Sequence, residues 1–589
     1  MTDAPDFKDT VFLPKTDFPM KAGLAAKEPA ILERWAKIGL YAKLREQRAG
    51  RERFLLHDGP PYANGDIHMG HAMNKILKDI VVRSQSLMGK DAPYVPGWDC
   101  HGLPIEWKVE EAYRAKKLNK DEVDPVAFRA ECRAYAEKWV SVQRAQFERL
   151  GIMGDWDDPY LTMKFDAEAT IAGELLKFAE SGQLYRGAKP VMWSPVEKTA
   201  LAEAEVEYED IISTQIDVAF EIVDAPNAPE LVGAHAVIWT TTPWTIPVNQ
   251  ALAYGAEIEY TLYEITTHVD APHLNGKRVL IAHDLYSAFQ QRVERHIRAL
   301  PSAKDWPSEH PIVEFDDFLF EPSVLDGGYC NIKGSQLTGA VARHPMHKLG
   351  GFFAKPRPFL AGDFVTTDAG TGLVHMAPDH GEDDFLLCKA NGIDPVFAVD
   401  GGGMYRDDWL WLGGQGSVIN KKFVAPEGPI CTDLREAGGL LAASEDFKHS
   451  YPHSWRSKAK IIFRCTPQWF IPMDRHVEAA DGGASNGGTL RGIALDAIET
   501  TRWVPEKSQN RIRAMVEGRP DWVISRQRAW GVPIALYVHR QSGEYLKDPA
   551  VNARILAAFR AGGADAWYAG DHQALLGSDY KLDDYEVVT

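Results

Sequence analysis

The segment from residue 54 to residue 98 places the strongest limit on the fold, because its pattern follows the order strand, loop, helix, strand. The apolar run at residues 54–57 predicts a short buried strand. Apolar residues then recur at helical spacing from Met69 to Val81, and residues 94–95 predict a second short strand. Such units have parallel strands joined by a right-handed crossover. The sequence therefore predicts an α/β domain built on a parallel sheet.

The loop before this helix, PPYANGDIHMGH at residues 60–71, places two histidines around a glycine at the helix entrance. Unpaired N–H groups and partial positive charge attract anions to a helix N-terminus. Gly70 would let a flat ligand or phosphate approach, and His68 and His71 would add donors on one side of the first turn. The alternatives are a helix cap, a buried structural histidine or a metal site. A cap explains one histidine better than two, and a metal site lacks a further ligand at fixed spacing. The sequence favours a polyphosphate site.

Asp99 directly follows the second predicted strand. Ligands of open parallel sheets bind beyond the carboxyl ends of the strands, so Asp99 should face the same crevice as the loop. Its carboxylate would either hold a substrate cation or cap the next turn, and the sequence alone favours neither. Anion donors on one wall and a cation acceptor on the other would suit the joining of a nucleotide to an amino acid.

The 589-residue chain is too long for one hydrophobic core, so we expect at least two domains. Residues 1–52 predict an N-terminal helical arm, and residues 53–202 predict the first part of the α/β domain. Residues 203–410 contain β-rich runs separated by turn residues, which predicts a mostly β insertion. Residues 411–589 predict a return to the α/β domain, incomplete at the C-terminus.

Composition excludes several classes of protein. The excess of 83 Asp+Glu over 65 Lys+Arg gives a formal charge of −18, which argues against indiscriminate nucleic-acid coating. No leader and no apolar run of bilayer length is found, so we expect a cytoplasmic protein without a membrane partner. The cysteines are dispersed without a CxxC pair, which disfavours a zinc knuckle or a disulfide framework: Cys100, Cys132, Cys330, Cys388, Cys431 and Cys465.

Several long motifs make the chain resemble the isoleucyl branch of the class I aminoacyl-tRNA synthetases of bacterial type. HMGH at residues 68–71 resembles the class I HxGH signature, and DGPPYANG at residues 58–65 resembles the isoleucine-type sequence before it. Further shared blocks are GWDCHGLPIE at residues 97–106 and WVISRQRAWGVP at residues 522–533. The resemblance covers essentially the whole chain. It implies a Rossmann-like parallel-sheet catalytic domain interrupted by a mostly β-barrel editing domain.

The resemblance also implies an activity. The protein would be an aminoacyl-tRNA ligase that uses ATP with Mg²⁺ to activate isoleucine and then attaches it to tRNA(Ile). The histidine signature would stabilise charge on the phosphates electrostatically rather than covalently. Asp99 would bind the amino group of isoleucine, and Pro60 and Trp530 would line its side-chain pocket. The residues that the resemblance assigns to ATP are Pro61, Asn64, His68, Gly70 and His71.

A second site is implied because a pocket for isoleucine cannot exclude valine well. One missing methylene changes binding by only about 1–3 kcal/mol, and isoleucine against valine in this family is the standard example. The insertion would therefore hydrolyse valyl-tRNA(Ile). A run of threonines is most simply explained by the high strand propensity of this residue, but its hydroxyls could instead hold the tRNA end and a water. Asp384 would anchor the amino group, with Asp383 as the alternative, and His375 would exclude isoleucine. The implied editing residues are Thr240, Thr241, Thr242, Asn249, His375 and Asp384.

The chain departs from the family pattern at two places. Ser194 and Glu197 stand where some relatives carry a cysteine pair, so no metal is expected here and any zinc should lie beyond Thr589. No KMSKS-type lysine loop is present, and Lys421 and Lys422 are in a different context. We therefore expect the N-terminal part of a longer, monomeric enzyme that activates isoleucine poorly by itself. The alternatives are a valyl- or leucyl-type synthetase, or a catalytically incomplete tRNA- or nucleotide-binding module.

Overall fold

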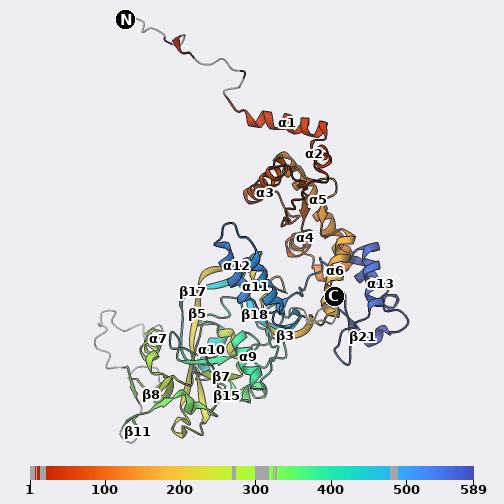
Figure 1. The fold of residues 1–589 in the computed structure, drawn as a ribbon. Coiled ribbons are helices and arrows are strands. Elements are labelled where there is room, and N and C mark those ends of the chain that lie inside the picture. The colour runs from red at the N-terminus through yellow and green to blue at the C-terminus, as the bar shows by residue number, and fades with distance from the viewer. Residues whose placement is uncertain are drawn as a thin grey trace. The chain divides into compact units, whose positions relative to one another are not determined.

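The computed structural model describes residues 7, 10–12, 17, 21–267, 274–298, 318–322, 324–325, 328–477 and 488–588. The chain forms two compact units, one of residues 1–180 together with 528–589 and one of residues 181–527 (Figure 1). In the described part of the chain, no helix has both the length and the apolar character that a membrane span needs. The structure combines helices with a large mixed sheet, which confirms a mixed α/β fold, while the parallel Rossmann-like sheet and the β-barrel stay predictions.

The first unit is mainly helical, with short paired strands. Gly39 separates its first two helices in a left-handed conformation with φ of 61°. Its elements are α1 (Leu24–Ile38), α2 (Leu40–Arg48), α3 (Met69–Leu87), β1 (Gly97–Trp98), α4 (Leu103–Ala115), α5 (Pro125–Arg149), β2 (Tyr160–Leu161), α6 (Phe165–Glu180), β20 (Tyr537–His539), α13 (Pro549–Gly562), α14 (Asp565–Ala569), α15 (His572–Leu576) and β21 (Tyr585–Val587).

The strands predicted at residues 54–57 and 94–95 are wrong. Neither segment forms a strand, and the isolated parallel bridges of this region lie outside both segments, between Arg53 and Asp91 and between Tyr62 and Asp99. Proline has no N–H to donate, so prolines 60, 61, 93 and 96 prevent a continuous ladder from forming. The parallel direction agrees with the prediction, and β1 and β2 form a short parallel pair.

The helix α3 lies where its apolar repeat predicts, but it buries little of that repeat. Only Lys75 and Val82 are buried among its residues. The apolar side chains on its opposite side are exposed, and they include Met69, Met73, Leu77 and Ile80. The core of the unit instead gathers around large aromatic residues from other elements, among them Trp98, Phe147, Trp156 and Trp530.

The second unit contains a large mixed sheet, with strand order β10-β8-β9-β6-β5-β14-β15-β7-β16, with β13 on β8 and β17 on β5. A smaller sheet has the order β19-β18-β3-β4. The strands are β3 (Tyr185–Ser194), β4 (Thr199–Ala200), β5 (Val206–Asp224), β6 (His235–Thr240), β7 (Ala251–Tyr254), β8 (Glu259–Thr267), β9 (Lys277–Ala282), β10 (Phe318–Pro322), β11 (Val324–Leu325), β12 (Gly328–Tyr329), β13 (Asn331–Lys333), β14 (Val341–Arg343), β15 (Pro356–Ala361), β16 (Leu373–Met376), β17 (Leu440–Ser454), β18 (Ile462–Ile471) and β19 (Trp522–Val523). The helices are α7 (Tyr286–Arg298), α8 (Gly351–Ala354), α9 (Glu382–Ala390), α10 (Pro429–Glu436), α11 (Leu490–Thr500) and α12 (Ser508–Glu517).

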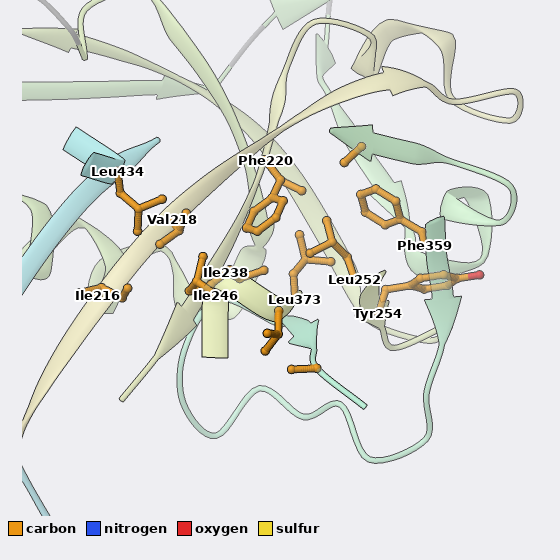
Figure 2. Close-up of a cluster of buried hydrophobic side chains, with 14 of the residues drawn as sticks. Ile216, Val218, Phe220, Ile238, Ile246, Leu252, Tyr254, Phe359, Leu373 and Leu434 are labelled. Atoms are coloured by element: carbon orange, nitrogen blue, oxygen red, sulfur yellow. The ribbon is translucent and has the colours of Figure 1, made fainter. Parts of the chain in front are cut away.

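The main core of this unit lies against the large sheet. Figure 2 shows Phe220, Ile238, Ile246 and Leu252 gathered together, and all four are fully buried. Residues 213–220 of β5 are buried on both faces, although the polar residues Ser213, Thr214, Gln215 and Asp217 stand among them. Two of the β-rich runs within residues 203–410 form β6 and β16.

The compact unit of residues 181–527 is wider than the insertion expected at residues 203–410, and the bounds of that insertion stay a prediction. The strand β17 pairs with β5 along its whole length, although it begins thirty residues after the expected boundary at residue 410. The strand β3, which precedes residue 203, pairs with β18. Long-range strand pairing sets these limits, and local composition carries no signal of it.

Candidate functional site

The first turn of α3 is closed by a reciprocal cap between the two motif histidines. His68 is the N-cap residue, and its Nδ1 accepts hydrogen bonds from the N–H groups of Gly70 at 3.1 Å and His71 at 3.4 Å. In return, Nδ1 of His71 accepts from the N–H of His68 at 3.3 Å. The two rings stack with centroids 3.8 Å apart. Both histidines therefore act as caps, which the sequence had made the less favoured interpretation.

The cap fixes the tautomers of both rings. A nitrogen that accepts a hydrogen bond carries no proton, so each neutral ring holds its proton on Nε2. Neither Nε2 has a hydrogen-bond partner among the described residues. Burial, then the charges of His68 and Lys75, lowers the pKa of His71, which favours the neutral form of that ring. The capped turn thus presents two N–H donors, while the caps occupy three backbone N–H groups, those of His68, Gly70 and His71.

Gly70 is required by the histidine cap itself. A Cβ at this position would lie 2.9 Å from Cε1 of His68 and 3.0 Å from its Nδ1, closer than real Cβ contacts allow. Any other residue would push the His68 ring off the turn. The sequence predicts that a ligand approaches the backbone closely at Gly70. In the structure the imidazole of His68 occupies at least part of this space.

The loop before α3 is held by side chains from α5. Tyr135 donates its hydroxyl proton to Oδ1 of Asn64 at 2.8 Å. The fully buried Gln143 donates its amide protons to the carbonyls of Tyr62 at 3.1 Å and Gly65 at 2.8 Å. These contacts give the loop one conformation without a regular element of its own.

Asp99 lies directly beside this loop. Its N–H donates to the carbonyl of Pro61 and its carbonyl accepts from the N–H of Ala63, both at 2.9 Å. Its carboxylate accepts the N–H of His101 at 3.2 Å, so the predicted turn cap is present. Burial raises the pKa of Asp99, and the contacts with His101 oppose this effect. The structure therefore brings Asp99 and the proline end of the motif together.

Trp530 is anchored on the turn that follows Asp99. Its indole N–H donates to the carbonyl of Cys100 at 2.7 Å, and its backbone N–H donates to the buried carboxylate of Glu106 at 3.0 Å. Its ring lies 4.9 Å from that of His101, and the side chain has no exposed surface. Trp530 is therefore attached to the turn that follows Asp99, although the indole packs in the core and lines no open space.

In the second unit, the threonine run leads to His375. Oγ1 of Thr240 accepts the N–H of Thr242 at 3.0 Å, and Thr245 donates its hydroxyl proton to the carbonyl of Thr242 at 2.8 Å. The same hydroxyl lies 3.0 Å from Nε2 of His375, and because its own proton is engaged, Nε2 must be the donor. Nδ1 of His375 is buried and has no partner among the described residues. Burial, with a contribution from His380, lowers the pKa of His375 to about 4.

Asp384, in the first turn of α9, contacts the end of the strand that carries His375. Its Oδ2 accepts the N–H of Ala377 at 2.7 Å. Burial raises the pKa of Asp384 to about 6, and the charge of the exposed Asp383 adds to the rise. Asn249 is different, because it is fully buried and its carboxamide bonds to the carbonyl of Ala251 at 2.8 Å and to Arg357 at 3.1 Å. As placed, Asn249 supports the core and offers no free polar atom to a ligand.

The described residues contain no group of three or more histidine, cysteine or acidic side chains that could hold a metal ion. At the position where a cysteine pair was considered, Oγ of Ser194 accepts the N–H of Glu197 at 3.3 Å. The carboxylate of Glu197 accepts the hydroxyl proton of Ser454 at 2.7 Å. These side chains are built into the interior of the second unit.

The family model of class I tRNA synthetases (I, L, M and V) matches residues 30–588. The chain belongs to this family. Isoleucine–tRNA ligase of Zymomonas mobilis is 63% identical over 588 residues, which are 100% of this chain and 58% of that protein. The enzyme of the same name from Mesorhizobium japonicum is 48% identical over 97% of this chain and 58% of its own length. The chain thus spans somewhat more than half the length of the curated relatives it matches.

Isoleucine–tRNA ligase of Agrobacterium fabrum is 51% identical over 94% of this chain and 54% of its own length. The solved LeuRS–tRNA–LeuAMS ternary complex of Agrobacterium radiobacter aligns with a TM-score of 0.31 and 14% identity, over 89% of this chain and 52% of that one. That structural likeness is too weak to carry weight. Membership of the synthetase family rests on the sequence motifs and the family model.

Two supports of the synthetase motifs were not predicted from sequence. Gln143 joins the loop to the strand before Asp99, because its Oε1 accepts the indole N–H of Trp98 at 2.9 Å. Asp58, at the start of the DGPPYANG motif, forms ion pairs with Lys75 and Lys78 of α3. Tyr94 donates its hydroxyl proton to the same carboxylate at 2.6 Å. Lys75 interrupts an apolar helical repeat one turn after His71. This interruption was the only feature of the sequence that could have indicated the ion pairs of Asp58.

Proposed function

We propose that this chain forms the activation site and the editing site of an isoleucine–tRNA ligase. The observation that supports this most strongly is the 63% identity, over the whole chain, with the Zymomonas mobilis protein of that name. The geometry agrees, because the donors of His68 and His71 and the carboxylate of Asp99 lie on neighbouring segments joined by backbone hydrogen bonds. The first unit would be the Rossmann-like catalytic domain and the large sheet of the second unit the editing domain.

In activation, MgATP and isoleucine are the substrates. The carboxylate of isoleucine attacks the α-phosphate, pyrophosphate leaves, and isoleucyl-adenylate forms. The two Nε2–H groups at the start of α3 would donate to phosphate oxygens as negative charge shifts among them, which is electrostatic stabilisation by fixed donors. Asp99 would pair with the ammonium group of isoleucine, which requires the ionised carboxylate. A terminal hydroxyl of tRNA(Ile) would then attack the carbonyl of the adenylate and release AMP.

In editing, a water molecule attacks the ester of valyl-tRNA(Ile) and releases valine. Asp384 would hold the ammonium group of valine at the end of β16. The neutral His375 lies one hydrogen bond from Thr245, which bonds to the carbonyl of Thr242. This arrangement would place a rigid imidazole beside the threonine run and narrow the pocket against the larger isoleucine. Asn249 takes no direct part in this scheme.

The test is calorimetric binding of non-hydrolysable isoleucyl-, valyl- and leucyl-adenylate analogues to the purified chain. We expect the isoleucyl analogue to bind tightest, and Asp99→Asn to weaken its binding about tenfold or more by removing a charge-assisted contact. Asp158→Asn, an exposed position in the same unit, should bind the analogue like the wild type. Tighter binding of the valyl or leucyl analogue would favour those branches of the family, and binding of none would contradict an activation site.

A further inference from the structure

A small pocket in the second unit adjoins the threonine run, and nothing in the activation or editing chemistry above uses its charges. It is open to solvent, with a free volume of about 40 Å³. That volume suffices for roughly three water molecules. The residues of this threonine–lysine pocket that bear on its chemistry are Thr214, Thr241, Thr242, Lys421, Glu445 and Lys460.

The ammonium group of Lys460 is the feature that calls for a ligand. The side chain is half-buried, and it has no hydrogen-bond or ion-pair partner among the described residues. Its Nζ lies 5.5 Å from the centre of the Tyr451 ring. Burial, and then the charge of Lys421, lowers the pKa of Lys460, and the charge of Glu445 opposes this shift without cancelling it. A partly desolvated cation without a carboxylate costs free energy unless an anion satisfies it.

The other charges of the pocket do not supply that anion. The carboxylate of Glu445 lies 2.6 Å from Nζ of Lys421 and is thereby engaged at the rim. Two ammonium groups therefore face one carboxylate, and the pocket keeps an excess of positive charge. Lys421 is largely exposed, so its ion pair with Glu445 is weak and free to rearrange.

The hydroxyls of the pocket add neutral donors. Those of Thr214, Thr241 and Thr242 have no hydrogen-bond partner among the described residues. An excess cation combined with free hydroxyl donors suits the oxygens of a phosphate group better than a cationic or apolar ligand. Two of these threonines belong to the run that the proposed editing site uses, so the phosphate would lie next to the ester to be hydrolysed.

We propose that the threonine–lysine pocket binds a backbone phosphate of the tRNA acceptor end, with Lys460 as the residue that recognises its charge. This inference rests on the proposed editing function and extends it by assigning a specific part of the substrate to a specific cation. Lys460 is then a binding residue for the RNA and takes no part in the hydrolytic step. Removing its charge should raise KM for valyl-tRNA(Ile) and leave kcat unchanged.

The experiment measures hydrolysis of valyl-tRNA(Ile) by the wild-type chain, Lys460→Met, Lys460→Arg and Lys422→Met at several salt concentrations. We expect Lys460→Met to raise KM about tenfold through loss of a charge-assisted contact. The slope of log(kcat/KM) against log salt should become shallower by about 0.7, the value for one phosphate of a single strand. Lys460→Arg keeps the charge and should stay within about twofold of the wild type. Lys422→Met is the matched control, because Lys422 is exposed and does not line the pocket.

The outcomes separate this proposal from the function on which it rests. Absence of hydrolysis by the wild-type chain would contradict the editing function and the phosphate site together. Hydrolysis with unchanged KM and salt slope in Lys460→Met would contradict the phosphate site alone, and so would an equal loss in Lys460→Arg. Inorganic phosphate provides a further arm. If it raises Tm of the wild type but not of Lys460→Met while their KM values agree, the pocket takes free phosphate and the RNA assignment is wrong.

Discussion

The indole N–H of Trp98 donates to Oε1 of Gln143 at 2.9 Å, and the amide nitrogen of Gln143 donates to two carbonyls of the motif loop. A single buried side chain on α5 thus connects the strand that ends before Asp99 with the loop that ends at His68. All the hydrogen-bonding groups of its carboxamide are used inside the protein. The two proposed walls of the activation site share this support.

Gln143→Met should therefore loosen both walls together. The substitution leaves the buried Trp98 indole and two more accessible loop carbonyls without their partner; an unsatisfied buried group costs about 1–3 kcal/mol, and a group that water reaches costs less. We expect a loss of roughly 2–5 kcal/mol in the free energy of unfolding and weaker ATP binding, measured by urea unfolding and calorimetry. Ser141→Ala, at an exposed position of the same helix, is the control. Wild-type stability and ATP affinity in Gln143→Met would show that this support is dispensable.

Substitutions of His68 separate its capping role from its proposed role toward phosphate. Asparagine is a good N-cap residue but cannot supply the Nε2–H donor, whereas alanine supplies neither. His68→Ala should cost about 1 kcal/mol of stability, and His68→Asn should cost little. ATP binding should fall in both variants. If His68→Asn binds ATP as tightly as the wild type, the histidine is only a cap.

The sequence predicts those parts of the structure that depend on local pattern. Helical spacing locates α3, and the turn residues around Asp99 place it beside the loop. Gln143 is not predictable in this way, because its partners lie some eighty residues earlier in the chain and an isolated glutamine in a helix carries no signal. The strand predicted at residues 54–57 fails for a related reason, since pairing depends on donors in a distant segment rich in proline.

The same distinction holds in the second unit. The threonine run and His375 lie close together, as a shared site requires, because each belongs to a strand or turn with a clear local pattern. Asn249 shares that pattern, yet its environment is set by Arg357, more than a hundred residues later. Burial by distant segments decides which polar side chains remain free. It also decides the pKa values, which no local sequence pattern records.

His375 should make the stability of the protein depend on pH. Its folded-state pKa of about 4 lies below its ordinary value, so the unfolded state binds the extra proton between these values. Its contribution is fully present above about pH 6.5 and is lost as the pH falls toward 4, at up to about 1.4 kcal/mol per pH unit. His375→Asn lacks this titration. The difference in unfolding free energy between wild type and His375→Asn should therefore shrink as the pH falls. A difference independent of pH would contradict a neutral, buried imidazole.

Asp384 should show the opposite sign in stability. Its folded-state pKa of about 6 lies above the ordinary value, so the folded state binds the extra proton and stability is lost as the pH rises from about 4 to 6. At pH 7, Asp384→Asn removes a partly buried charge and keeps an acceptor for the N–H of Ala377. We expect this variant to be more stable than the wild type by roughly 1–3 kcal/mol in urea unfolding.

Asp384→Asn should be less active than the wild type although it is more stable. Holding the ammonium group of valine requires the ionised carboxylate, so wild-type kcat/KM for valyl-tRNA(Ile) hydrolysis should rise through about pH 6. Asp384→Asn should be slow, with no such rise. Asp383→Asn changes the exposed neighbour, the alternative for this role in the sequence, and should keep the wild-type rate and much of the pH profile. A slow Asp383→Asn beside an active Asp384→Asn would transfer the amino-group contact to Asp383, because only the residue that binds the substrate cation is needed in its charged form.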